Sequence, residues 1–96
     1  MKQGTYVIVR CRDAGVHAGE YRDHEGREVR LINSRRLWYW SGAASLSELA
    51  AHGAKNTDSC KFAVSVKEIT LLDACEIITC DPGGEKMIRD CPEWRA

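Results

Sequence analysis

The sequence predicts a mainly β (α+β) protein: a small five-stranded antiparallel barrel or bent sheet with one short α-helix. Three observations predict this class. Short segments alternate β-branched or aromatic residues with polar ones, clusters of Gly, Asp and Asn separate these segments, and only one stretch carries clear helix-capping residues. Among closed shapes an SH3-like barrel is the first expectation. An open α+β sheet is the alternative.

Length and composition limit the broad class. A chain of 96 residues has room for one domain, spanning residues 1–96, and for one core. Its 44% hydrophobic and 29% charged residues are typical of a globular rather than a disordered chain. No apolar run is long enough for a membrane span, and residues 1–5 lead into a strand pattern instead of a secretory signal. We therefore expect a cytoplasmic protein that does not enter membranes.

The first strand is predicted over residues 5–12, because this segment is rich in β-branched and aromatic residues. Side chains in a strand point alternately to opposite faces. Tyr6 and Ile8 should therefore share one face, and Val7 and Val9 the other.

Two further strands are expected to continue an antiparallel meander. Residues 13–15 form a turn before a weaker strand over residues 16–21, in which Gly19 marks a bulge or a close backbone approach. Residues 23–26 form the next turn, whose glycine suits a positive φ, and residues 27–33 form the third strand.

The middle of the chain predicts the helix. Asn33-Ser34 interrupts the strand pattern before an aromatic block over residues 35–40. Ser45 and Glu48 then have the spacing of a capping box, which predicts a helix over about residues 45–52 that stops at Gly53.

The C-terminal half adds two strands, over residues 62–70 and 75–80. Residues 81–84 break the chain, and residues 85–91 form a short helical segment that ends at Pro92. In the tail, residues 92–96, Trp94 is too apolar to stay free. It should fold back onto the sheet or dock on a neighbouring subunit.

The five cysteines are expected to be reduced thiols that serve as small buried hydrophobes. Their number is odd, and no two form a C-x-x-C pair. A zinc site would need Cys91 or a histidine beside Cys75 and Cys80, so we predict no metal and no cofactor.

The residues that best suit ligand binding are Arg35, Arg36, Trp38 and Trp40. In an extended segment, Arg36, Trp38 and Trp40 share one face, and Arg35 lies on the other. Burying both faces would place an unpaired arginine under the sheet, so one face should meet solvent, a ligand or a partner chain. Guanidinium groups hold phosphate and indoles stack on bases, which together suit a nucleotide. The same residues also suit core packing or a subunit contact.

Catalysis is not expected. The sequence lacks the nucleophile-elbow, phosphate-loop and zinc-protease motifs, and its three histidines lie in separate segments without an acidic partner at a telling spacing. The formal net charge of +0 also argues against a general nucleic-acid binder.

Residues 35–43 (RRLWYWSGA), followed by Ser45-Leu46 and Leu49-Ala50, resemble a family of small proteins from phages and prophages. The family pattern also includes residues 6–10, 14–16 and 60–62, so the resemblance runs from about residue 3 to residue 80. It brings no activity with it. By analogy, small phage proteins that are not enzymes often inhibit host defence, and one class sequesters nucleotide second messengers at oligomer interfaces.

Three hypotheses follow. The first is a homo-oligomeric sponge for a cyclic nucleotide or a cyclic ADP-ribose-type ligand, with Arg35 and Arg36 on phosphate and Trp38 and Trp40 on base. The second is a module that inhibits a host or phage protein, with the same aromatic residues as hot spots. The third is a single-stranded nucleic-acid binder, which the zero net charge disfavours.

Overall fold

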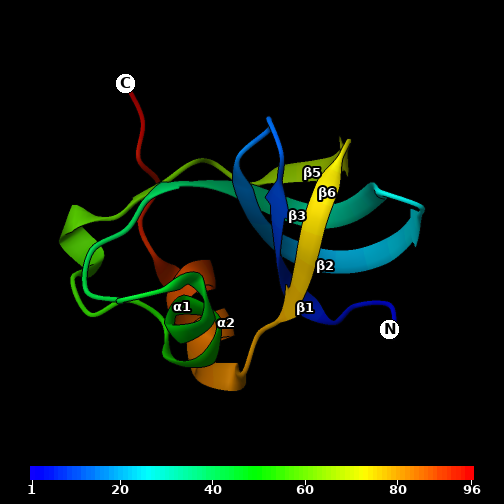
Figure 1. Cartoon of the computed structure of the whole chain (residues 1–96). Helices are drawn as coiled ribbons and strands as arrows, with labels where there is room; N and C mark the ends of the chain where they lie inside the picture. The colour runs from blue at the N-terminus through cyan, green and yellow to red at the C-terminus, as the bar shows by residue number, and fades with distance from the viewer.

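The computed structural model describes all 96 residues and shows one antiparallel sheet with two short helices beside it (Figure 1). The strands are β1 (Tyr6–Cys11), β2 (Val16–Glu25), β3 (Glu28–Tyr39), β4 (Lys61–Phe62), β5 (Val66–Leu71) and β6 (Ala74–Thr79). The helices are α1 (Leu46–His52) and α2 (Pro82–Asp90), and a 3₁₀ turn spans Thr57–Ser59. The predicted α+β class is confirmed, with six strands in place of five.

The sheet is curled but open. Its order is β4-β3-β2-β1-β6, with β5 paired to β3 alongside this path. Because only Leu72 and Asp73 connect β5 to β6, the two edges of the sheet must meet at this corner. There the Ala74 amide donates to the Arg27 carbonyl at 2.9 Å. However, β5 pairs with β3 and β6 with β1, so the closed, SH3-like barrel does not form.

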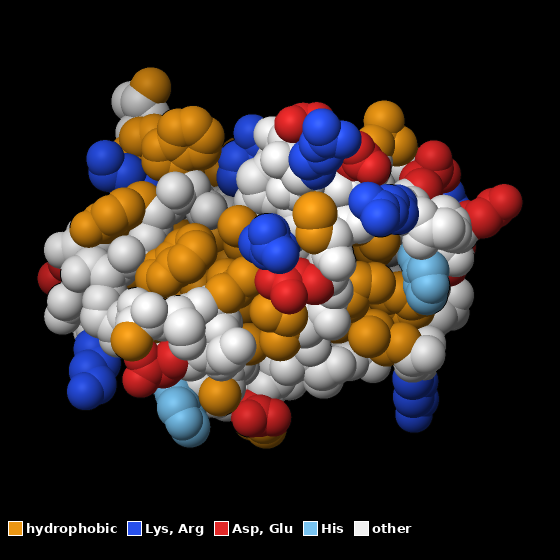
Figure 2. Space-filling view, in the orientation of Figure 1, with side chains coloured by type: hydrophobic (Ala, Val, Ile, Leu, Met, Phe, Trp, Pro, Cys, Tyr) orange, Lys and Arg blue, Asp and Glu red, His pale blue; other side chains and the backbone are white.

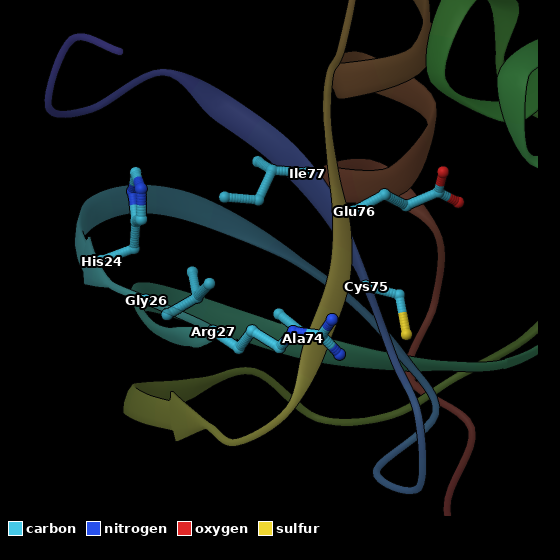
Figure 3. Close-up of a pocket in the computed structure, with 8 residues that line it drawn as sticks. His24, Gly26, Arg27, Ala74, Cys75, Glu76 and Ile77 are labelled. Carbon is cyan, nitrogen blue, oxygen red and sulfur yellow. The ribbon is translucent and has the colours of Figure 1, made fainter.

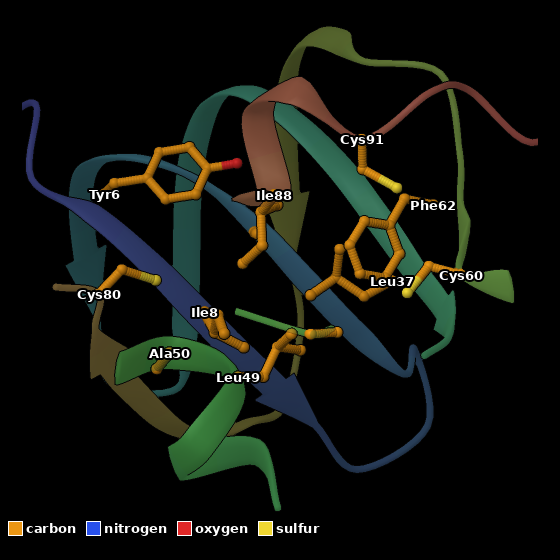
Figure 4. Close-up of a cluster of buried hydrophobic side chains, with 12 residues drawn as sticks. Tyr6, Ile8, Leu37, Leu49, Ala50, Cys60, Phe62, Cys80, Ile88 and Cys91 are labelled. Atoms are coloured by element: carbon orange, nitrogen blue, oxygen red, sulfur yellow. The ribbon is translucent and has the colours of Figure 1, made fainter. Parts of the chain in front are cut away.

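The two faces of the curled sheet carry two separate cores. Tyr6 and Ile8 face the helices, whereas Val7 and Val9 face the inside of the curl, as the alternation along β1 predicts. The helix-side core consists of Tyr6, Ile8, Ala18, Leu37, Leu49, Ala50, Ala54, Cys60, Phe62, Cys80, Ile88 and Cys91 (Figure 4). The inner core consists of Val7, Val9, Cys11, Tyr21, Val29, Leu31, Leu71 and Ala74.

The strand β3 runs without a break through the predicted interruption at Asn33-Ser34. Asn33 adopts a left-handed conformation with φ 50°, and pairing continues because β2 and β5 flank β3 on its two sides. The register shifts between Ala18 and Glu20, where a Cβ on Gly19 would lie 3.0 Å from the Ser34 Cα. The close approach predicted for Gly19 is confirmed.

Two boundaries differ from the sequence prediction. The strand β2 extends to Glu25, so Gly26 and Arg27 alone make the turn, with Gly26 at the expected positive φ of 59°. Residues 62–70 do not form one strand. They divide into β4 and β5, because Phe62 and Val66 pair with two separate parts of β3.

The helix α1 begins as predicted. Ser45 Oγ accepts a hydrogen bond from the Glu48 amide at 3.1 Å. The Glu48 carboxylate accepts one from the Ala44 amide, one residue before the position expected for a capping box. Gly53, at φ 80°, ends the helix.

The helix α2 is longer than predicted, because it includes the glycines expected to break the chain. Gly84 is buried where α2 crosses α1, and a Cβ there would overlap the carbonyl oxygen of Ala50. Glycine is therefore used here for close helix packing rather than as a breaker.

The C-terminal tail folds back onto the sheet, which is one of the two arrangements expected for Trp94. Glu93 forms a parallel bridge with Phe62, and the Trp94 amide donates to the Phe62 carbonyl at 2.8 Å. The tail therefore covers the outer edge of β4.

We predict that Gly84→Ala destabilises the protein by about 1–3 kcal/mol or more, because overpacking forces α1 and α2 apart. Gly83→Ala is the matched control in the same helix turn, since its nearest neighbour would lie 3.5 Å from the new Cβ. It should be neutral or stabilising by up to about 1 kcal/mol. Urea unfolding of both variants tests this, and equal stabilities would contradict the close crossing.

Candidate functional site

The two adjacent arginines of β3 leave the strand on opposite faces, as predicted. Arg35 faces the helices and is only 6% exposed. Arg36 faces the other way and is exposed to solvent. Only one of the two can therefore meet a ligand.

The buried guanidinium of Arg35 connects β3 to two other segments of the backbone. Its guanidinium donates to the carbonyls of Phe62 (3.0 Å) and Ala63 (2.9 Å) next to β4, and to those of Ile88 and Cys91 (both 2.8 Å) at the end of α2. The positive charge also suits the negative end of the helix dipole. These bonds correct the prediction that Arg35 binds phosphate, because its donors are already engaged.

The other three predicted site residues do come together. Arg36, Trp38 and Trp40 line a groove of about 330 Å³ together with Leu37, residues 13–15 of the β1–β2 turn and Val16 at the start of β2. Strand alternation puts Arg36 and Trp38 on one face of β3, and Trp40 follows just beyond its end, where it also packs against the helix-side core. The turn lies beside them because His17, the second residue of β2, pairs with Arg36.

The guanidinium of Arg36 has no protein partner. Six arginines pair with carboxylates and Arg35 binds carbonyls, which leaves Arg12 and Arg36 without a partner of either kind; the six are Arg10, Arg22, Arg27, Arg30, Arg89 and Arg95. In the groove, the charge of Arg36 is therefore free to bind an anionic group.

A family model described as a domain of unknown function, DUF6948, matches residues 4–88. The chain belongs to this family. No curated protein and no solved structure matches it. The matched range contains every residue of the groove and ends before Trp94, so the tail that covers β4 lies outside the part shared with the DUF6948 model.

Next to the groove, the aromatic side chains continue as an exposed patch. Trp38, Tyr39 and Trp94 are 61%, 50% and 47% exposed. The rings of Trp38 and Trp94 stack at 6.4 Å and 10°, and the Lys61 ammonium lies 6.0 Å from the Tyr39 ring and 5.4 Å from the Trp94 ring. Figure 2 shows this gathering of hydrophobic side chains beneath the C-terminal end of the chain. Only the apolar character of Trp94 could have indicated the contribution of the tail.

The sequence reasoning missed Asp13. Asp13 lines the groove from the β1–β2 turn and forms no ion pair. Aspartate is common in turns for purely local reasons, so nothing in the sequence marks it as a site residue.

A second, smaller pocket adjoins Arg36. It has a volume of about 220 Å³, and its lining includes Arg36, His17 and Ser34 as well as the side chains of Val64 and Val66. The Ser34 hydroxyl is fully buried and has no hydrogen-bond partner. Burial lowers the pKa of His17, whose Nε2 lies 2.8 Å from the Ala14 carbonyl and donates to it.

The largest hollow, about 480 Å³, lies between β6 and the β2–β3 turn, where the curl stays open. Its polar groups do not converge. Glu76 pairs with Arg10 at 2.8 Å, and Figure 3 shows the Glu76 and Cys75 side chains directed away from His24 and Ile77. This hollow is the open side of the inner core rather than a built site.

All five cysteines are free thiols, and Cys75 is the exposed one. Burial raises the pKa of the Cys80 thiol to about 12 and also raises the pKa of Cys11 and Cys91.

No group of three or more His, Cys, Asp and Glu residues is arranged to hold a metal ion. In addition, no helix is long and apolar enough to cross a membrane.

We predict that Arg35→Ala lowers the free energy of unfolding by about 3–5 kcal/mol, because it leaves buried carbonyls without donors. Arg36→Ala, one residue away and exposed, should change stability by less than about 0.5 kcal/mol. Chemical denaturation followed by far-ultraviolet circular dichroism measures both. A mild effect of Arg35→Ala would contradict its structural role.

We also predict that one thiol of the five reacts rapidly with iodoacetamide in the native protein, because thiolates must be both accessible and deprotonated to react. Mass spectrometry should place the label on Cys75, and Cys75→Ser should remove the rapid phase. Rapid labelling of Cys80 or Cys11 would show that the cores open readily.

Proposed function

We propose that this protein is a non-enzymatic binding protein whose groove takes a nucleotide-type ligand. The observation that carries the proposal is the unpaired guanidinium of Arg36 beside the indoles of Trp38 and Trp40, in a groove of about 330 Å³. A free cation next to planar aromatic groups is the combination that a phosphate joined to a base requires.

Each groove residue has a distinct role in this proposal. Arg36 donates to phosphate oxygens, and Trp38 and Trp40 stack on the base, which is worth about 1–3 kcal/mol for each stacked base. Asp13 lines the same groove from the β1–β2 turn. Its carboxylate only accepts hydrogen bonds, so it would select a base that presents an exocyclic amino group.

The biological setting is part of the same proposal. The resemblance to phage and prophage proteins supports a role against host defence, in which the protein sequesters a cyclic nucleotide or cyclic ADP-ribose-type signal in the cytoplasm of the host cell. A homo-oligomer would suit such a ligand, since each groove offers the single guanidinium of Arg36 and a second subunit would supply another. Net charge of +0 supports a small ligand over a nucleic-acid chain.

A second candidate function has its own observation. The patch of Trp38, Tyr39 and Trp94 is exposed, and contiguous aromatic surface of this kind is typical of protein interfaces. In this candidate, the protein inhibits a host or phage protein, and these three residues are the hot spots.

We predict saturable quenching of tryptophan fluorescence when the protein is titrated with cyclic di- and trinucleotides and cyclic ADP-ribose isomers. Arg36→Ala should weaken binding of the active compound about 10- to 100-fold, the equivalent of a charged hydrogen bond of about 1.5–3 kcal/mol. Trp40→Ala should weaken it by a similar factor through lost stacking. Recovery of the intact compound after heating would support binding without turnover.

The controls separate the two candidates. Arg27→Ala removes an exposed arginine in the β2–β3 turn, which does not line the groove, and should leave nucleotide affinity unchanged. Tyr39→Ala changes the patch but not the groove, so it should affect capture of a protein partner far more than nucleotide affinity. No quenching across the panel, or loss of binding in Arg27→Ala as well, would reject the nucleotide proposal in favour of the protein interface.

A further inference from the structure

One face of β3 carries a row of residues whose polar groups are not all paired within the fold. Ser34, Arg36 and Trp38 alternate along the strand, and Trp40 follows just beyond its end. At about 3.3 Å per residue, Ser34 and Trp38 lie about 13 Å apart along β3. The row therefore extends well past the aromatic groove, to the other side of Arg36.

Ser34 is the unexplained member of this row. Its hydroxyl is fully buried and forms no hydrogen bond, which destabilises the folded state. Nearly all buried polar atoms are paired with protein groups or with ordered water, so the Ser34 hydroxyl has room for a partner that is a water molecule or a ligand group. Ser34 lines the second pocket, of about 220 Å³, whose other walls are mostly apolar.

Arg36 lies between the two pockets and lines both. The groove of about 330 Å³ lies on one side of its side chain, with the indoles, and the pocket of about 220 Å³ lies on the other, with Ser34. A charged group bound to Arg36 would thus have a separate cavity on each side of it.

The second pocket suits an uncharged group. His17 is the one other titratable side chain in it besides Arg36. Burial favours its neutral form, and its Nε2–H already donates to the Ala14 carbonyl. The pocket therefore offers no second cation for another phosphate. It offers a hydroxyl and a ring nitrogen within apolar walls, which suit the edge and faces of a base.

We propose that the complete site is bipartite and binds a dinucleotide: Arg36 holds a linking phosphate, one base stacks in the aromatic groove, and the other enters the pocket of Ser34. This inference rests on the proposed nucleotide function and specifies its ligand class. The Ser34 hydroxyl then gains the hydrogen-bond partner that the free protein lacks.

The test compares ligands with two bases and with one. Cyclic di-AMP and cyclic di-GMP are titrated by calorimetry beside cyclic AMP and cyclic GMP, against the wild-type protein and variants of the second pocket. Val66→Phe fills this pocket from the half-exposed edge of β5, and Leu72→Phe is its matched control, because Leu72 is exposed and lines neither cavity. Ser34→Ala removes the hydroxyl but keeps the Cβ that packs against Gly19.

We expect a dinucleotide to bind at least about tenfold more tightly than the mononucleotide with the same base. Val66→Phe and Ser34→Ala should reduce the dinucleotide affinity towards that of the mononucleotide, while Leu72→Phe leaves the affinity for both unchanged. Thermal unfolding of the variants confirms that they remain folded.

Two results would overturn the inference in distinguishable ways. If mono- and dinucleotides bind equally through Arg36 and Trp40, and Val66→Phe has no effect, the groove binds nucleotides but the site is not bipartite. If no compound binds to the wild-type protein, the proposed nucleotide function itself fails, and the bipartite site fails with it.

Discussion

The buried guanidinium of Arg35 is the interaction on which the arrangement of this protein depends. It connects the middle of β3 to the backbone next to β4 and to the end of α2, three segments that lie far apart in the sequence. A buried cation without a carboxylate partner is tolerated because carbonyl oxygens and the end of a helix dipole surround it. Since α1 packs against α2 through Gly84, this one side chain also fixes the position of both helices over the sheet.

The anchoring of Arg35 has a direct effect on the opposite face of β3. Because alternation is strict along an extended strand, holding Arg35 under the sheet turns Arg36 outward. Trp38 then follows on the same outer face, where it stacks on Trp94. The core thus sets the geometry of the groove: Leu37 belongs to the helix-side core, Trp40 packs against it, and only Arg36 is left without a partner in the fold. This division explains how one strand serves both packing and the proposed binding.

Local features were predictable from the sequence, and long-range ones were not. The faces of β1 and the cap at Ser45 depend on neighbours a few residues away, and the close approach at Gly19 depends on β3, the next strand in the sequence; all three are confirmed. The separation of Arg35 from Arg36 was also predictable, but not which of them is buried, because that depends on carbonyls near residues 62 and 90. The open edge between β5 and β6, the helical Gly84 and the contribution of Asp13 all arise from contacts across the fold that no local pattern encodes.

The pairing of β1 has a consequence for how the chain reaches its fold. One edge of β1 pairs with β2, its neighbour in sequence, but the other pairs with β6, where Thr79 lies opposite Val7. At a synthesis rate of about 5–20 residues per second, this second edge stays open on the order of seconds while β6 is still being made. Unpaired edges of apolar strands readily associate with other chains. The segment that forms the centre of both cores is therefore also the one that a nascent chain exposes longest.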